Sequence, residues 1–167
     1  MSSYEVRAIK FIHSIYPYIE NCTCLEEYDT AIFKYNMKNN RRVHFDWGSA
    51  RFALITSDYV VKMNYNPENV ARWGGCEEEH RFYNKAYNEG FDYLFAKTKP
   101  YYYKGVVFYI MPRIHNIGKT YWDADAYMSA EEKRWCRKNG LIDLHYQNYG
   151  WKNNHIVIID YGANDYR

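Results

Sequence analysis

The chain has 167 residues, 47% of them hydrophobic and 25% charged, which is the composition of a globular domain and excludes a disordered chain. Its 22 basic and 20 acidic residues give a formal net charge of +2, so electrostatic attraction alone would not bind it to nucleic acid. The length is sufficient for one compact domain with a hydrophobic core of its own.

The cysteines and the start of the chain indicate a compartment. No Cys-x-x-Cys pair or regular disulfide framework is present, so we expect free thiols at Cys22, Cys24, Cys76 and Cys136. The first residues contain no apolar secretion segment. No apolar run approaches the roughly 18 residues that a membrane-spanning helix requires. We therefore predict a cytoplasmic protein that does not cross a membrane.

Two amphipathic helices are predicted at the start of the chain. In residues 3–16, apolar side chains recur at helical spacing behind Ser3 as a cap, and Pro17 would end the helix. The second helix would begin at the capping-box pattern Thr23-x-x-Glu26. Neither helix carries a chemical signature. We expect both to cover one face of the sheet that follows, with a partner-docking surface as the alternative.

After residue 40 the hydrophobic period changes from helical to two-fold, which predicts β-strands. Short turns join them into an antiparallel meander, and the first turn contains Gly48. The predicted strands are 42–47, 51–55 and 59–65.

Lys62 lies in the third of these strands, between valines and a methionine. In such an apolar setting an ammonium group needs a partner. The simpler interpretation is a lysine on the solvent face of the strand. In the first turn, the backbone amides of Ser49 and Ala50 could point at phosphate oxygens, and Arg51 could supplement them.

A helix is predicted over residues 76–87, with Glu77, Glu78 and Glu79 in its first turn. Acidic residues at a helix N-terminus are favoured by the helix dipole, which explains them without any function. Gly90 would end this helix.

A β-hairpin is predicted next, with residues 99–103 paired to 106–111 across Lys104-Gly105. Pro112 would end the second strand, because it has a fixed φ and no backbone donor. The many tyrosines of the hairpin could form a base-stacking platform. The alternation of side chains along a strand favours one core face and one wet face instead.

A second capping box, Ser129-x-x-Glu132, predicts a helix that ends at Asn139-Gly140. The chain then reads Gly-Leu-Ile-Asp-Leu-His-Tyr-Gln-Asn over residues 140–148, followed by a polar turn. A β-branched run leads from this turn to Asp-Tyr-Gly at residues 160–162. The spacing leaves room for a turn and for a strand that presents Asp160.

The order of Asp143, Asn148 and Asp160 suits phosphoryl transfer. One carboxylate would take or orient the acceptor hydroxyl proton, while an amide oxygen and a second carboxylate hold Mg²⁺ against the nucleotide phosphates. A structural role without any nucleotide would also explain these residues, with Asp143 capping a loop and Asp160 forming a turn. A metal site of His145 and His155 with these acids lacks a convincing ligand spacing.

Asp-x-x-x-x-Asn followed by Asp-aromatic-Gly resembles the catalytic loop and metal-binding motif of the protein-kinase-like superfamily. The Asp-Leu-His-x-x-Asn motif is more similar to that of aminoglycoside and choline kinases than to that of ordinary protein kinases. Small bacteriophage proteins of this kind are similar in their Gly-Ser-x-Arg turn and terminal Ile-Asp-Tyr-Gly, which would place the chain in a host cytoplasm. The resemblance extends over residues 41–162.

The resemblance implies an α+β, protein-kinase-like fold: a five-stranded antiparallel N-lobe sheet with helix C, a truncated C-lobe and two extra N-terminal helices. Within one compact chain, residues 1–40 would be the helical extension, 41–111 the N-lobe and 112–167 a minimal C-lobe. Residues 111–114 would form the hinge whose backbone meets the adenine ring.

The resemblance also implies roles for individual residues. Lys62 would hold the α- and β-phosphates and pair with Glu79, or with Glu78 as the second choice. The cofactor-binding residues would be Lys62, Glu79, Glu78, Gly48, Ser49, Arg51 and Met111; the metal ligands Asn148 and Asp160; and the catalytic residues Asp143, Lys62 and His145.

Three departures separate the chain from protein kinases. The phosphate-covering turn has one glycine instead of three, and Leu141 and Ile142 stand where protein kinases carry His and Arg. The chain also ends five residues after Gly162, which leaves out the activation segment and most of the acceptor-binding lobe.

We therefore expect an ATP- and Mg²⁺-dependent phosphotransferase that acts on a hydroxyl group of a protein or small molecule, with part of the acceptor site supplied by a partner or a second copy. The first alternative is a kinase-like scaffold, a pseudokinase that binds and modulates a partner protein. The second is a nucleic-acid-binding protein, against which the nearly balanced charge counts.

Overall fold

The computed structural model describes residues 1–65, 67–116, 124–141 and 148–161. The fold is α+β, and the chain divides into two compact units. The first unit consists of residues 1–68 and 99–113, and the second of residues 69–98 and 114–167. The boundary after Arg113 falls within the segment that the sequence indicated as a hinge.

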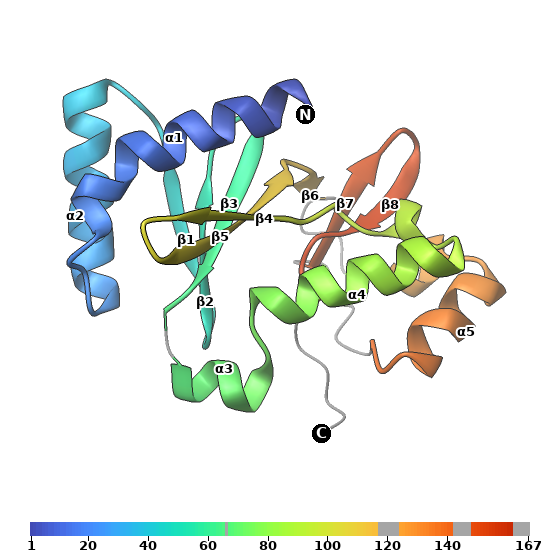
Figure 1. Ribbon diagram of the computed structural model, residues 1–167. Coiled ribbons are helices and arrows are strands. Elements are labelled where there is room, and N and C mark those ends of the chain that lie inside the picture. Colours follow the sequence, from blue (N-terminus) through green and yellow to red (C-terminus); the bar gives the residue numbers. More distant parts are fainter. Residues whose placement is uncertain (66, 117–123, 142–147, 162–167) are drawn as a thin grey trace. The chain divides into compact units, whose positions relative to one another are not determined.

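The first unit contains the five-stranded antiparallel sheet that the sequence predicted (Figure 1). Its spatial order is β1-β2-β3-β5-β4, so β3 is the central strand. The strands are β1 (His44–Trp47), β2 (Arg51–Ile55), β3 (Tyr59–Asn64), β4 (Lys99–Tyr103) and β5 (Val106–Pro112).

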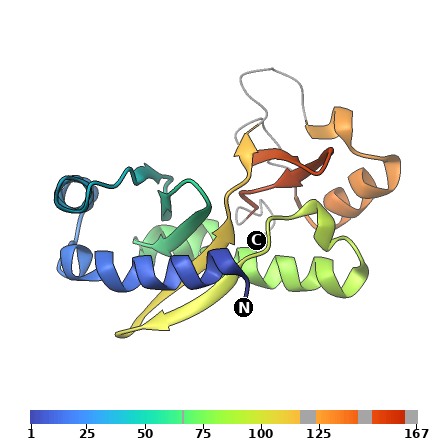
Figure 2. The same ribbon diagram turned by 90° about the horizontal axis from the view of Figure 1, so that it is seen from above.

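Both N-terminal helices pack on this sheet, as expected. The first, α1 (Ser3–Ile19), lies along the sheet beside the β4–β5 hairpin (Figure 2). The second, α2 (Leu25–Asn39), places Tyr28 against Phe52 of β2, with ring centroids 4.6 Å apart. One hydrophobic core joins the two helices to the sheet, and its fully buried members include Ile12, Ile15, Leu54 and Phe108.

The tyrosines of the β4–β5 hairpin alternate as the strand period requires. Tyr101 bonds to His13 of α1 at 2.6 Å, and Tyr103 stacks on the same imidazole with ring centroids 4.2 Å apart. Tyr102, between them, is exposed. The expectation of a core face and a wet face is therefore confirmed.

The predicted ends of both helices were wrong by one or more residues. Ser2 rather than Ser3 caps α1, and Pro17 lies inside its last turn, where its missing amide costs one helical bond. In α2 the cap is Cys24 rather than Thr23, and Glu27 takes the place given to Glu26. The Glu27 carboxylate accepts from the Thr23 amide at 2.6 Å, and this bond holds the pKa of Glu27 below its usual value.

The predicted strand ended at residue 111, before Pro112, but Pro112 is the last residue of β5. It pairs with Tyr59 at the end of the strand, and the Arg113 amide then donates to the Asp58 carbonyl at 2.9 Å. The Arg113 guanidinium also donates to the Thr56 carbonyl at 2.8 Å. Pairing therefore continues past the proline, because a strand end needs no donor from the proline itself.

The second unit contains helices and a three-stranded sheet of order β6-β7-β8. The sequence predicted α4 and α5, and the short helix α3 contains the division between the units after residue 68. The elements are α3 (Pro67–Trp73), α4 (Cys76–Glu89), η1 (Asp92–Leu94), β6 (His115–Asn116), η2 (Ala124–Tyr127), α5 (Ala130–Lys138), β7 (Tyr149–Lys152) and β8 (His155–Ile158).

The capping box predicted for α5 is present. Ser129 Oγ accepts from the Glu132 amide at 3.3 Å, and the Glu132 carboxylate accepts from the Ser129 amide at 2.5 Å. The same carboxylate accepts from the Tyr93 hydroxyl at 2.9 Å. Burial and this hydrogen bond raise the pKa of Tyr93 to about 12. The cap therefore also joins α5 to the segment after α4.

Two strands of the second unit were not predicted. Residues 149–152 were interpreted as part of a polar turn, and no element was predicted for residues 115–116, but these segments form β7 and β6. The Asn153-Asn154 pair has positive φ at both residues, which matches the twist of a two-residue hairpin. A Cβ atom on Gly150 would overlap the His115 carbonyl, so only glycine lets β6 pair with β7.

Two expectations concern thiols and membranes. All four cysteines are free thiols, as the absence of a disulfide framework predicted. In the part of the chain that the structure describes, no helix is both long enough and apolar enough to span a membrane.

The junction between α2 and β1 depends on Asn36, which the sequence gave no reason to single out. Its amide group donates to the Val43 carbonyl at 2.9 Å, and its oxygen accepts from the Val43 amide at 3.0 Å. Because Val43 is buried, loss of both bonds should not be recovered by water.

Asn36→Ala should lower the free energy of unfolding by about 1–3 kcal/mol, measured by urea denaturation. The matched control is Asn39→Ala in the same helix, whose side chain makes one bond to the Tyr35 carbonyl from an exposed position. A loss at Asn36 no larger than the loss at Asn39 would contradict this role.

Candidate functional site

Lys62 is buried in the central strand of the sheet. It lies in β3 with Ala53 of β2 on one side and Tyr109 of β5 on the other, and only 8% of the residue is exposed. The simpler interpretation, a lysine on the solvent face, is therefore wrong. Burying an ammonium group is costly without compensating partners, so its position calls for a structural or functional reason.

The turn between β1 and β2 contains Gly48, Ser49 and Arg51. The Gly48 amide donates to the Arg51 carbonyl at 2.9 Å, and the Tyr65 hydroxyl donates to the Gly48 carbonyl at 2.8 Å. These bonds fix the backbone of the turn. Gly48 does not have a positive φ, and the nearest atom to an added Cβ would be the Arg51 carbonyl oxygen at 4.0 Å. The fold itself therefore does not require glycine at this position.

The two glutamates considered as partners of Lys62 differ in their surroundings. Glu79 of α4 is fully buried, on the same face as Phe82 and Tyr83. Glu78 forms an ion pair with Arg81 one turn further along the helix and is only partly buried. Burial therefore favours Glu79 over Glu78. Lys62 belongs to the first unit and Glu79 to the second, and their pairing stays a prediction.

The two predicted metal ligands, Asn148 and Asp160, lie together at the open end of the β7–β8 hairpin. Tyr149 pairs with Ile158, so Asn148 and Ile159, the residues just outside this pair, lie opposite each other, and Asp160 follows Ile159 directly. The Asn148 carbonyl accepts from the Ile159 amide at 2.6 Å and from the Asp160 amide at 3.2 Å. We call this closure of the hairpin the Asn148 neck. The sequence predicted the strand before Asp160 but not the partner strand that forms the neck.

Tyr161 anchors the chain directly after Asp160. Its hydroxyl donates to the Ala96 carbonyl at 2.6 Å in a buried position, and its ring packs on Phe95 with centroids 5.0 Å apart. The Ala96 amide donates in turn to the Ile158 carbonyl at 2.8 Å. Asp160 is therefore held on both sides. The sequence identified an aromatic residue here only through the Asp-aromatic-Gly motif.

Three other predicted residues have different outcomes. Met111 is buried in β5, where it pairs with Val60. Asp143 and His145 lie outside the described residues, and their roles stay predictions.

The ligand chemistry of the neck suits Mg²⁺. In the described ranges, no group of three or more His, Cys, Asp or Glu side chains is arranged to hold a metal ion. Mg²⁺ does not need such a cage, because it is usually held by one or two carboxylates together with substrate phosphates and water. The neck contains one residue with a carboxylate, Asp160, and one with an amide oxygen, Asn148.

Comparisons with known proteins identify no family. No family model matches the chain, and neither curated proteins nor solved structures gave a match.

Tyr161→Phe should destabilise the protein by about 1–3 kcal/mol, because the buried Ala96 carbonyl loses its donor. Guanidinium denaturation monitored by tryptophan fluorescence measures the change. The matched control is Tyr87→Phe, since Tyr87 is exposed on α4. Equal stability of the two variants would show that the Tyr161 hydroxyl contributes nothing to holding this segment.

Proposed function

We propose that this protein binds ATP with Mg²⁺ and transfers the terminal phosphoryl group to a hydroxyl group of a protein or small molecule. The observation that carries the proposal is the Asn148 neck. Two residues that are twelve positions apart, an amide and a carboxylate, are held together by direct backbone bonds. Their types and order are those that the kinase-like resemblance requires for a metal site.

The central position of Lys62 supports the same function. A lysine buried in the middle strand of an antiparallel sheet, following a turn that contains a glycine, suits a group that binds phosphates. Glu79 is a second buried ionisable group, on a different element. Because buried charged groups are costly and gather at functional sites, a buried lysine and a buried glutamate favour a binding role.

Each residue would have one role in this function. Lys62 would hold the α- and β-phosphates, and Glu79 would position Lys62. Asn148 and Asp160 would hold Mg²⁺, which neutralises charge on the phosphates when bound. Asp143 would orient the acceptor hydroxyl and accept its proton, and His145, two residues further along the chain, would be the third catalytic residue. The chain contributes mainly orientation and fixed charge, which is what phosphoryl transfer requires of a protein.

Asp160→Asn should remove the Mg²⁺-dependent thermal stabilisation by ATP, because an amide replaces the carboxylate that Asp160 supplies at the neck. In the wild type, ATP at 100 times its Kd should add about 2.7 kcal/mol of stability. Lys62→Met should weaken the effect without abolishing it. The matched control is Asp29→Asn on the exposed face of α2, which should bind like the wild type.

An unchanged shift in Asp160→Asn would refute the metal assignment. Transfer itself is measured with γ-labelled ATP and the protein alone or with candidate acceptors. Nucleotide binding without transfer to any acceptor would favour the scaffold alternative over the enzyme.

Gly48→Ala should separate binding from folding. Stability should stay within about 1 kcal/mol of the wild type, because the backbone is unstrained and the added methyl group has room. The affinity for Mg²⁺-ATP should fall several-fold, since a side chain would keep the phosphates away from the turn. Isothermal titration calorimetry measures the affinity.

The contrasting variant is Gly105→Ala in the β4–β5 turn. Gly105 has a φ of +81°, so alanine there should cost roughly 1–2 kcal/mol of stability and leave nucleotide affinity unchanged. If Gly48→Ala binds Mg²⁺-ATP as the wild type does, the turn has no part in phosphate binding.

A further inference from the structure

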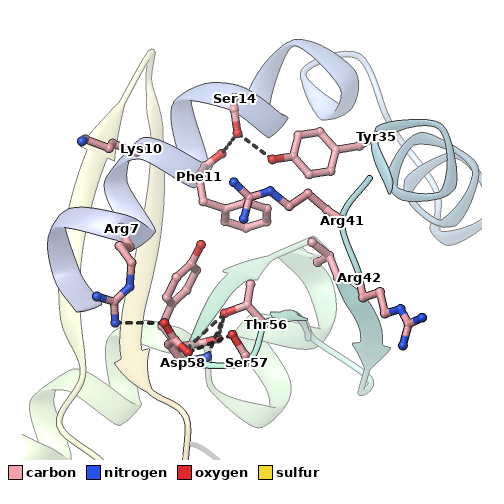
Figure 3. A pocket seen from close by; sticks show the side chains of 12 residues that line it. Arg7, Lys10, Phe11, Ser14, Tyr35, Arg41, Arg42, Thr56, Ser57 and Asp58 are labelled. Carbon is pink, nitrogen blue, oxygen red and sulfur yellow. Dashed lines mark hydrogen bonds and ion pairs between the residues drawn. The ribbon is translucent and has the colours of Figure 1, made fainter. Parts of the chain in front are cut away.

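The first unit contains a cavity of about 460 Å³ that the nucleotide site does not use (Figure 3). It is lined by α1, by Tyr35 of α2, by the segment that leads from α2 into β1, and by the turn between β2 and β3. The volume falls in the range of roughly 300–1,000 Å³ that is usual for small-molecule sites.

The lining of this cavity is strongly basic. Arg7, Lys10, Arg41 and Arg42 line it together with one carboxylate, Asp58. Four cations less one anion give a local formal charge of +3, which exceeds the +2 of the whole chain. The cavity therefore concentrates positive charge that the rest of the protein balances.

Among the described residues, one of these cations has an anionic partner. Arg7 pairs with Asp58 at 2.9 Å. Within the described part of the chain, the side chains of Lys10, Arg41 and Arg42 make no ion pair. In Figure 3, the Arg41 side chain extends across the cavity, while Lys10 and Arg42 point outward from its edge. Arg41 is thus the cation best placed to meet a ligand inside the cavity.

The segment that carries Arg41 and Arg42 is held at both ends. The Arg41 amide donates to the Asn36 carbonyl at 3.1 Å, and Asn36 binds both backbone groups of Val43. Asn40 adopts the left-handed conformation that ends α2. The two guanidinium groups therefore project from a fixed backbone, which limits the entropy lost when they bind a ligand.

The remaining walls of the cavity are aromatic and hydroxylic. Phe11, Tyr35 and Tyr59 contribute rings, and the Tyr35 hydroxyl bonds to Ser14 Oγ at 2.8 Å. Burial raises the pKa of Tyr59, while its hydrogen bond to Thr56 and the positive charge of Arg41 act in the opposite direction. The charge of Arg41 therefore acts on the hydroxyl of Tyr59, another residue that lines the cavity.

We propose that this cavity binds a small phosphomonoester. Guanidinium groups match the oxygens of a phosphate, and Arg41 and Arg42 would hold the dianion while Lys10 adds charge at the edge. The aromatic wall would contact the organic part, because the cavity is larger than a phosphate group requires. This site shares no lining residue with the proposed nucleotide site and does not depend on it.

The test measures binding of three probes to the full chain by calorimetry at constant ionic strength: O-phosphotyrosine, inorganic phosphate and tyrosine. We expect O-phosphotyrosine to bind more tightly than inorganic phosphate, and tyrosine not to bind. Inorganic phosphate that binds as tightly as O-phosphotyrosine would overturn the monoester assignment in favour of free phosphate.

Arg41→Gln should weaken O-phosphotyrosine binding about tenfold or more, the effect of losing a charged hydrogen bond. The matched control is Lys34→Gln, which removes one charge from an exposed position on α2 outside the cavity. Asp58→Asn should tighten binding several-fold, because it removes the carboxylate that Asp58 contributes to the lining of the cavity. An equal loss in Lys34→Gln and Arg41→Gln would show general charge attraction and overturn the site.

Two further measurements exclude other ligands. Asp160→Asn should bind O-phosphotyrosine as the wild type does, and Arg41→Gln should keep the stabilisation by Mg²⁺-ATP. Loss of O-phosphotyrosine binding in Asp160→Asn would assign that binding to the nucleotide site instead. A single-stranded oligonucleotide without terminal phosphates that binds more tightly than O-phosphotyrosine would replace the proposal with a nucleic-acid surface.

Discussion

The Asn148 neck is the constraint on which the candidate site depends. A hairpin brings its two ends together whatever their sequence, but the ends become a site only when the right side chains follow the last paired residues. Here the carbonyl of Asn148 takes the amides of Ile159 and Asp160 directly after the pair Tyr149–Ile158. Tyr161 then fixes the exit of the chain through the Ala96 carbonyl. Asp160 is held in position by backbone bonds before any ligand binds.

The first unit is organised by a different constraint, which is that helices must cover one face of its sheet. An antiparallel sheet of five strands buries one face only if another element packs against it. In this chain α1 and α2 supply that cover, with an aromatic core in which Phe11 meets Tyr35 and Tyr59. The same packing places Arg7 of α1 beside Asp58 of the β2–β3 turn. The basic cavity is thus a consequence of how the N-terminal helices cover the sheet.

The helix α4 is involved in a core of its own. Phe82 packs against Phe95, Trp135 and Tyr161, which are all residues of the second unit. The face of α4 that makes these contacts also carries Glu79. A helix that the resemblance assigns to the N-lobe therefore takes part in the packing around the segment that holds Asp160. The buried glutamate is therefore part of a helix whose inner face is packed into the core of the second unit.

The sequence by itself determined the helices, the five strands and the order of the motifs, because periodicity, capping boxes and turn residues are local signals. It also identified Lys62, Asn148 and Asp160 as residues of interest. It missed β6 and β7, whose pairing depends on the close approach that Gly150 permits. Only the tertiary structure decided that Lys62 and Glu79 are buried, that Asn148 meets Asp160, and that Arg7, Arg41 and Asp58 line one cavity. These outcomes depend on contacts between residues that are distant in the chain, and a local sequence pattern does not reveal such contacts.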